Sequence, residues 1–173
     1  MKKFNFVLTA IATAFLLVPS AWSDTGFALI KGTAPDSKLI GTVTLTKKTG
    51  GLMVVAKLSN VPPGEHGFHI HAIGSCEDMG KAAGGHFNPD KSPHGNYPMD
   101  GPIKAMAGDM GNVIIQPDGL GEFSTFMTGL TLNEGKYAVK GLSIILHEKK
   151  DDFSQPSGNT GARIGCGIIK IRE

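Results

Sequence analysis

The sequence predicts an all-β protein, a sandwich or barrel of about eight short strands in one domain. Glycine supplies 24 of the 173 residues, about twice its usual share of roughly 7%, and shows no collagen-like three-residue period. Helical periodicity is weak throughout. Short apolar or alternating segments are instead separated by Gly, Pro and Asn, as in turn-rich β proteins. A hydrophobic content of 40% excludes a disordered chain.

Each expected strand is a short apolar or alternating run that ends at a turn residue. In chain order the expected strands are Phe27–Lys31, Ile40–Thr46, Leu52–Ser59, Gly67–His71, Asn112–Gln116, Glu122–Met127, Gly141–His147 and Gly167–Ile171. The Asp118-Gly119 pair predicts a hairpin turn. The best candidate for a helical turn is Leu130–Gly135.

Two long segments lack a strand pattern. About forty residues lie between His71 and Gly111, rich in Gly, Pro, Asp and His, and a second polar loop spans Glu148 to Gly165. Loops longer than roughly 15 residues are uncommon and are usually functional or disordered. We therefore expect the chemistry in these two loops.

Residues 1–23 have the features of a secretory signal peptide. Two lysines precede an almost uncharged run from Phe6 to Val18, and Ala21 and Ser23 are the small residues of a cleavage site after Ser23. The run is short for a transmembrane span, although an uncleaved anchor is the alternative. We expect a periplasmic or secreted mature domain, 24–173, with no membrane attachment after cleavage.

The mature chain carries no excess charge. Without the two leader lysines it has 15 basic and 15 acidic residues, and Arg163 and Arg172 are its only arginines. This balance argues against nucleic-acid binding. Cys76 and Cys166 are its two cysteines, and in an oxidising compartment they are expected to form a disulfide, with two separate thiols as the alternative.

Three of the six histidines lie on expected strands near loops. His69 and His71 are two residues apart, so their side chains share one face of a strand. A chance pair would look the same. His147 ends another apolar strand, where a lone histidine is more often structural than a metal ligand.

A second set of metal-binding residue types follows in the first long loop. His86 and His94 are eight residues apart, and Asp109 comes after them. A mixed set of imidazole and carboxylate suits zinc, whereas imidazole alone also suits copper. Each signal is modest, but together they predict a metal site.

Several motifs, in order and correctly spaced over residues 26–171, resemble the copper/zinc superoxide dismutase family. They are Gly67-Phe68-His69-Ile70-His71, Gly84-Gly85-His86-Phe87-Asn88-Pro89, Gly108-Asp109-Met110-Gly111-Asn112, His147-Glu148-Lys149-Lys150-Asp151-Asp152 and Gly161-Ala162-Arg163-Ile164-Gly165-Cys166-Gly167. The resemblance implies an eight-stranded Greek-key β-barrel.

The resemblance also implies the metal ligands. The copper ligands would be His69, His71, His86 and His147. His86 would bridge copper to zinc and carry a proton during the cycle, and the zinc ligands would be His86, His94 and Asp109. His66 matches no ligand and is interpreted as structural.

Other matched positions would support these ligands. Asp151 would link His69 to His94, as a hydrogen-bonding partner of metal-bound imidazoles does. Arg163 would attract the substrate anion, although a solvated surface arginine is the alternative. The resemblance pairs Cys76 with Cys166.

One position departs from the family pattern. Met106 stands where a third zinc histidine is expected, three residues before Asp109. A thioether is a poor zinc ligand, and structural zinc sites are almost always four-coordinate. We expect zinc to bind weakly, to take water as its fourth ligand, or to be absent.

The implied function is that of an exported superoxide dismutase, which converts superoxide to dioxygen and hydrogen peroxide through copper redox cycling. The alternative is a non-enzymatic protein that stores or delivers copper on the same fold. Lys149 and Lys150 either steer the substrate or form an ordinary charged turn. The sequence leaves open whether the chain is a monomer or a homodimer.

Overall fold

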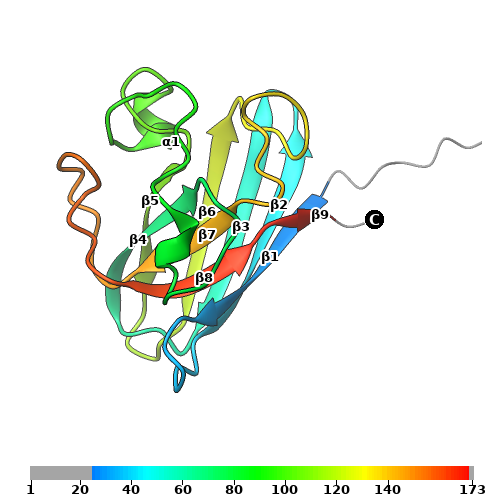
Figure 1. The fold of residues 1–173 in the computed structure, drawn as a ribbon. Coiled ribbons are helices and arrows are strands. Elements are labelled where there is room, and N and C mark those ends of the chain that lie inside the picture. Colours follow the sequence, from blue (N-terminus) through cyan, green and yellow to red (C-terminus); the bar gives the residue numbers. More distant parts are fainter. Residues whose placement is uncertain (1–24, 172–173) are drawn as a thin grey trace, which may run out of the picture.

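The computed structural model describes residues 25–171, so the expected signal peptide lies outside the described residues. The described part is almost entirely β (Figure 1). Its strands are β1 (Thr25–Gly32), β2 (Ile40–Lys48), β3 (Gly51–Ser59), β4 (Gly64–His71), β5 (Asp109–Ile115), β6 (Gly121–Thr128), β7 (Ser143–His147), β8 (Arg163–Ile168) and β9 (Lys170–Ile171). Within this range no helix has the length and apolar character needed to span a bilayer.

The strands form a closed antiparallel barrel, which confirms the expected fold class. The order is β2-β3-β6-β5-β4-β7-β8-β1, and pairing of β1 with β2 closes the barrel. β4, β5 and β6 are neighbours in sequence and in space, and β3 lies beside β6, which is the Greek-key arrangement. Closure leaves no exposed sheet edge except at the short β9, which continues β8 along β1.

Alternating burial explains which side chains fill the barrel. Phe68 and Ile70 on β4 and Leu146 on β7 belong to the main hydrophobic core. Because neighbouring residues on a strand point to opposite faces, the residues between them point outward, towards the loops. His69 and His71 are such outward residues, yet they are buried, since the loops cover this face.

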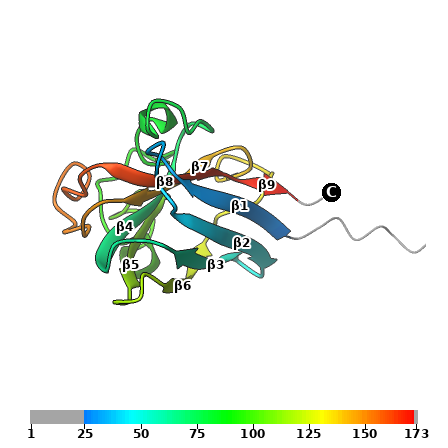
Figure 2. The ribbon, with the colours of Figure 1, turned by 90° about the horizontal axis from the view of Figure 1, so that it is seen from below.

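The first long loop, 72–108, contains the only helical turns in the described residues. These are the 3₁₀ turn η1 (Lys81–Ala83) and the one-turn helix α1 (Tyr97–Asp100). The Cys76–Cys166 disulfide ties the loop to β8, as predicted, and Ala83 packs with Ile145 beside it. Figure 2 shows this loop and the loop 148–162 extending from the barrel.

The expected helical turn at Leu130–Gly135 was wrong. Thr131 instead forms a bridge with Ala138. Leu130 and Leu132 are both buried, which is the two-residue period of an extended chain. The backbone therefore pairs across the loop, with Val139 donating to the carbonyl of Thr131.

The eight expected strands are all present, but the last begins earlier than predicted. β8 starts at Arg163, in a stretch interpreted as loop because its glycines leave no side-chain pattern. Its backbone pairs with β7, with Cys166 opposite Ile145. At Gly167 an added Cβ would lie 2.5 Å from the carbonyl oxygen of Leu29, so close packing against β1 accounts for this glycine. The Asp118-Gly119 hairpin is confirmed between β5 and β6.

Candidate metal centre

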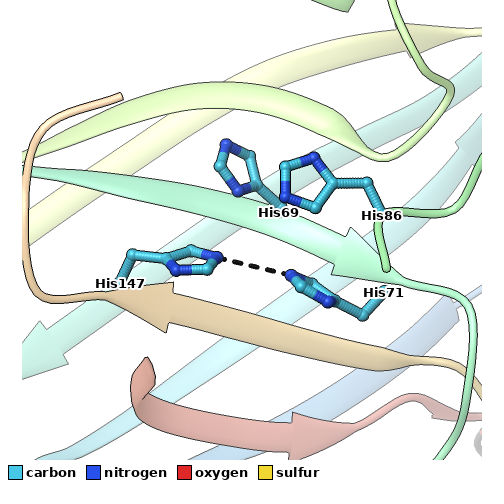
Figure 3. A group of neighbouring side chains, drawn as sticks. All are labelled: His69, His71, His86 and His147. Carbon is cyan, nitrogen blue, oxygen red and sulfur yellow. Dashed lines mark hydrogen bonds between the residues drawn. The ribbon is translucent and has the colours of Figure 1, made fainter. Parts of the chain in front are cut away.

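Four imidazoles meet on the outer face of β4 and β7, and we call them the strand group. His69 and His71 come from β4, His147 ends β7, and His86 comes from the loop 72–108. One ligand atom from each lies within 4.8 Å of the others. Figure 3 shows the rings of His71 and His147 facing one another, with a distance of 3.3 Å between their Nε2 atoms.

Strand pairing and one bridge create this arrangement. The register of β4 and β7 sets Phe68 opposite Leu146, which brings His147 next to the two β4 histidines. An isolated β-bridge joins His71 to His86. The predicted shared face of His69 and His71 is thus present.

The partners of the ring nitrogens indicate which atoms are available to a metal. His71 Nδ1 lies 2.9 Å from the carbonyl oxygen of Gly84, and His69 Nε2 lies 2.8 Å from Asp151 Oδ2. The buried Nδ1 of His69 has no hydrogen-bond partner among the described residues. A buried unpaired nitrogen is costly, and a metal ion would satisfy it, so these residues fit a metal.

Burial keeps three imidazoles of the strand group neutral, those of His69, His71 and His147. It lowers the pKa of His69 to about 4, even though Asp151 opposes the shift. Burial, followed by the nearby His69 and His86, lowers the pKa of His147 to about 2. Burial and His86 also lower the pKa of His71. Neutral imidazole is the form that binds a metal.

A second cluster, which we call the loop group, consists of His86, His94 and Asp109. Asp109 begins β5, and both histidines come from the loop 72–108. Asp109 Oδ1 lies 2.7 Å from His86 Nδ1, and Oδ2 lies 2.9 Å from His94 Nδ1. The second contact is not aligned as a hydrogen bond. Asp109 Oδ2 and His94 Nδ1 lie this close without a hydrogen bond, as two ligand atoms of one cation would. The loop group therefore also fits a metal.

His94 and Asp109 of the loop group are charged, in contrast to the neutral His69, His71 and His147. Burial opposes protonation of His94, but the adjacent carboxylates of Asp109 and Asp151 raise its pKa to about 9. Burial likewise opposes ionisation of Asp109, but His86 and His94 lower its pKa to about 2.

Asp151 connects the two groups. Its Oδ2 accepts from His69 Nε2 at 2.8 Å, and its Oδ1 accepts from His94 Nε2 at 2.9 Å. Asn112 holds the Asp151 backbone through two hydrogen bonds. Gly158 is required beside this link, because a Cβ there would lie 1.8 Å from Asp151 Oδ1. The contacts are those expected from the sequence.

A cavity of about 450 Å³ opens beside the strand group. Its lining includes His71, His86, Met106, His147, Thr160 and Arg163. Arg163 Nη1 donates to the carbonyl oxygen of Gly80 at 2.7 Å, and Nη2 donates to that of Gly84 at 2.6 Å. These bonds fix a cationic, half-buried guanidinium at the cavity.

Known proteins resemble this chain over most of its length. The family model described as copper/zinc superoxide dismutase (SODC) matches residues 39–169. The chain belongs to the copper/zinc superoxide dismutase family. "Superoxide dismutase [Cu-Zn] 2" of Mesembryanthemum crystallinum is 38% identical over 131 residues, covering 72% of this chain and 81% of that protein. "Superoxide dismutase [Cu-Zn] 1" of Aquifex aeolicus (strain VF5) is 37% identical over 138 residues, covering 76% and 80%.

A solved structure shares the fold as well. The crystal structure of the clock protein EA4 superimposes with a TM-score of 0.77 at 28% sequence identity, covering 94% of this chain and all of that chain. The similarity therefore extends over nearly the whole described barrel, including both loops.

Met106 is where this chain departs from the copper/zinc dismutase pattern. Its backbone N–H donates to Asp109 Oδ2 at 3.0 Å, so the backbone still shapes the loop group. Among the described residues, however, the group has three His, Cys, Asp or Glu donors and no fourth.

The remaining histidine, His66, and one of the two lysines, Lys150, contact neighbouring residues of the protein. His66 is buried on β4, with Nδ1 2.9 Å from the carbonyl oxygen of His147 and Nε2 2.8 Å from that of Pro62. It braces the backbone, consistent with its structural interpretation. Lys150 forms an ion pair with Glu65, which offsets its charge.

Sequence reasoning missed two residues that support the site from the loop 148–162. Gln155 makes two hydrogen bonds to the backbone of His94. Thr160 Oγ1 lies 3.0 Å from His147 Nδ1. Neither residue belongs to a motif or a hydrophobic pattern, so only the fold reveals these contacts.

Proposed function

We propose that this protein is a superoxide dismutase whose strand group binds copper. One observation carries the proposal: the four imidazoles of the strand group converge, and three of them, His71, His86 and His147, line the same cavity as Arg163. A set of imidazoles suits a redox-active copper ion, and a fixed guanidinium suits a small anionic substrate. A copper ion held there would supply the one-electron exchange that converts superoxide to dioxygen and hydrogen peroxide.

The chain's own residues would bind the anion and manage protons. Because carbonyl oxygens hold two nitrogens of Arg163, its charge stays at the cavity wall and little side-chain entropy is lost on binding the substrate. His86 faces Asp109 with Nδ1. Its Nε2 is then left to face the strand group, where it would either bind copper or hold a proton next to the substrate.

The decisive experiment measures superoxide removal by the copper-loaded protein. We expect catalytic removal, and Arg163→Ala should slow turnover by at least tenfold while copper remains bound. Arg163→Lys retains the charge but not the planar pair of donors, and is expected to fall between the two. Stoichiometric removal of one superoxide per copper would instead identify a copper-storage protein.

We also propose that the loop group binds zinc weakly, because three protein ligands leave one position to water or to the poor thioether donor of Met106. Chelator competition should show faster zinc loss from the native protein than from Met106→His. Met106→Leu, which removes the sulfur, separates the two explanations: unchanged zinc loss would mean that the thioether is not a ligand.

We propose that the protein is exported after cleavage following Ser23. The Cys76–Cys166 disulfide supports this, since such bonds persist in oxidising compartments. Mass spectrometry of the purified protein should find Asp24 at the N-terminus, and fractionation should recover it outside the cytoplasm. A chain that begins at Met1 in the cytoplasm would contradict export.

A further inference from the structure

Thr160 is an unusual partner for a metal-binding histidine. The other three histidines of the strand group pair their outer nitrogens with oxygens that only accept, from Asp151 for His69, Gly84 for His71 and Asp109 for His86. Such a partner fixes the ring proton on the nitrogen that faces it. A hydroxyl can donate or accept, so Thr160 does not fix the tautomer of His147.

The neighbouring contacts determine the direction of each hydrogen bond. The Gly84 carbonyl accepts from His71 Nδ1, so a neutral His71 has a lone pair on Nε2. That atom lies 3.3 Å from His147 Nε2, and the two nitrogens form a hydrogen bond only in the tautomer that has the His147 proton on Nε2. His147 Nδ1 then carries a lone pair. Thr160 Oγ1 lies 3.0 Å from this nitrogen, and its hydroxyl donates to it.

A metal held by both histidines demands the opposite direction. It needs the Nε2 lone pairs of both His71 and His147, so the ring proton of His147 has to be on Nδ1. Thr160 Oγ1 then has to accept. The His147 ring holds one proton in both arrangements, and Thr160 keeps its hydrogen and only rotates it.

We propose that Thr160 is a positioning residue that keeps His147 hydrogen-bonded in both tautomers, donating to Nδ1 without copper and accepting from it with copper. The inference rests on the proposed copper site. It explains how the strand group can be prearranged before copper binds without locking His147 in the wrong tautomer.

The surroundings of Thr160 hold its hydroxyl in place. Thr160 is only 5% exposed, and its carbonyl oxygen accepts from the Lys149 backbone N–H at 2.9 Å. Its methyl group packs over β4 at Gly67, where an added Cβ would lie 2.7 Å from Thr160 Cγ2. Since a β-branched side chain is stiff at χ1, this packing keeps the hydroxyl directed at His147.

The direct test is nitrogen-15 NMR of the histidine rings in the native protein, first copper-free and then loaded with diamagnetic Cu(I). We expect the proton of His147 on Nε2 without copper and on Nδ1 with copper. A proton on Nδ1 in both samples would overturn the inference. This measurement needs no variant and so does not depend on one that folds.

Two variants test the consequence for copper. Thr160→Val keeps the shape and removes the hydroxyl, and copper affinity by chelator competition should fall by about 10- to 100-fold, as on loss of other partners of metal-bound histidines. Thr160→Ser keeps the hydroxyl and should restore native affinity and the native Cu(II) electron paramagnetic resonance spectrum. Native affinity and spectrum in Thr160→Val would refute the proposal.

The two proposals fail in different ways. A protein that binds copper with the tautomer change but does not turn over superoxide would overturn the proposed function alone. A protein that turns over superoxide with an unchanged His147 tautomer would overturn the role of Thr160 alone.

Discussion

The strand group and the loop group are adjacent, share His86, and are positioned by different kinds of contact. Three of the four histidines in the strand group lie on β4 and β7, whose paired backbones fix their positions. In the loop group only Asp109 lies on a strand. His94 is held instead by side chains, Asp109 and Asp151 at its ring and Gln155 at its backbone.

Their electrostatics differ in the same way. Burial lowers the pKa of His69, His71 and His147, whereas carboxylates raise that of His94. The barrel thus provides a neutral, prearranged site, and the loops provide a charged site that depends on many weaker contacts. Changes to the loops should therefore affect the second site first.

The largest expected effect is the pH dependence of stability in the metal-free protein. Below pH 6.5 the unfolded chain protonates His69, His71 and His147, whereas in the folded protein His69 stays neutral down to about pH 4 and the other two also have lowered pKa values. The unfolded state then binds more protons, so stability falls as the pH is lowered, by up to about 1.4 kcal/mol per pH unit for each imidazole. Denaturant unfolding between pH 4 and 8 measures this loss.

His94 should produce the opposite trend. Its pKa is raised to about 9, so its contribution is complete below pH 6.5 and is lost as the pH rises towards 9. Stability should therefore be greatest near pH 6.5. A curve that stays flat from pH 4 to 9 would contradict the contrast between the groups.

Loss of the disulfide should come next in size. Cys76 and Cys166 are 90 residues apart, and the double substitution to Ser should lower the free energy of unfolding by about 2–5 kcal/mol. Because the bond tethers the loop that carries His86 and His94, zinc affinity should fall more than copper affinity. Equal losses for both metals would show that the strand group depends on the loop just as much.

The sequence predicted the barrel because its strands follow a two-residue period and end at clear turn residues. It grouped the candidate ligands because His69 and His71 share one face and the remaining motifs resemble a family in order. The candidate ligand side chains lie close together in two groups. Asp151 contacts both His69 and His94, as the resemblance implies.

The missed features have no local pattern. β8 is recognised only by pairing with β7, since its glycines carry no side chains to alternate. Gln155 and Thr160 act on histidines 61 and 13 residues away in sequence. Contacts of this kind depend on how the two loops meet, which spacing along the chain does not encode.

Asp151→Asn should weaken both groups at once, since the carboxylate contacts His69 and His94. An amide offers one acceptor instead of two, so one histidine loses its partner. We expect a loss of about 10- to 100-fold in copper and zinc affinity, measured by chelator competition. Asp152→Asn, at the neighbouring exposed carboxylate, is the control and should leave both affinities unchanged.

The smallest effect separates the groups most cleanly. Gln155 Oε1 accepts from the His94 backbone N–H at 3.1 Å, and Nε2 donates to the His94 carbonyl at 2.8 Å. Gln155 is exposed, so its two hydrogen bonds fall at the low end of the usual range of about 0.5–1.5 kcal/mol each. A total of about 1 kcal/mol means that Gln155→Ala should weaken zinc binding less than about tenfold. Copper affinity should not change.

Gln116→Ala, in the hairpin between β5 and β6, is the matched control and should affect neither metal. A loss of copper affinity in Gln155→Ala would mean that a loop contact reaches the strand group through Asp151, which is hydrogen-bonded to both His69 and His94. Loss of zinc affinity alone would instead show that the strand group does not depend on this loop contact.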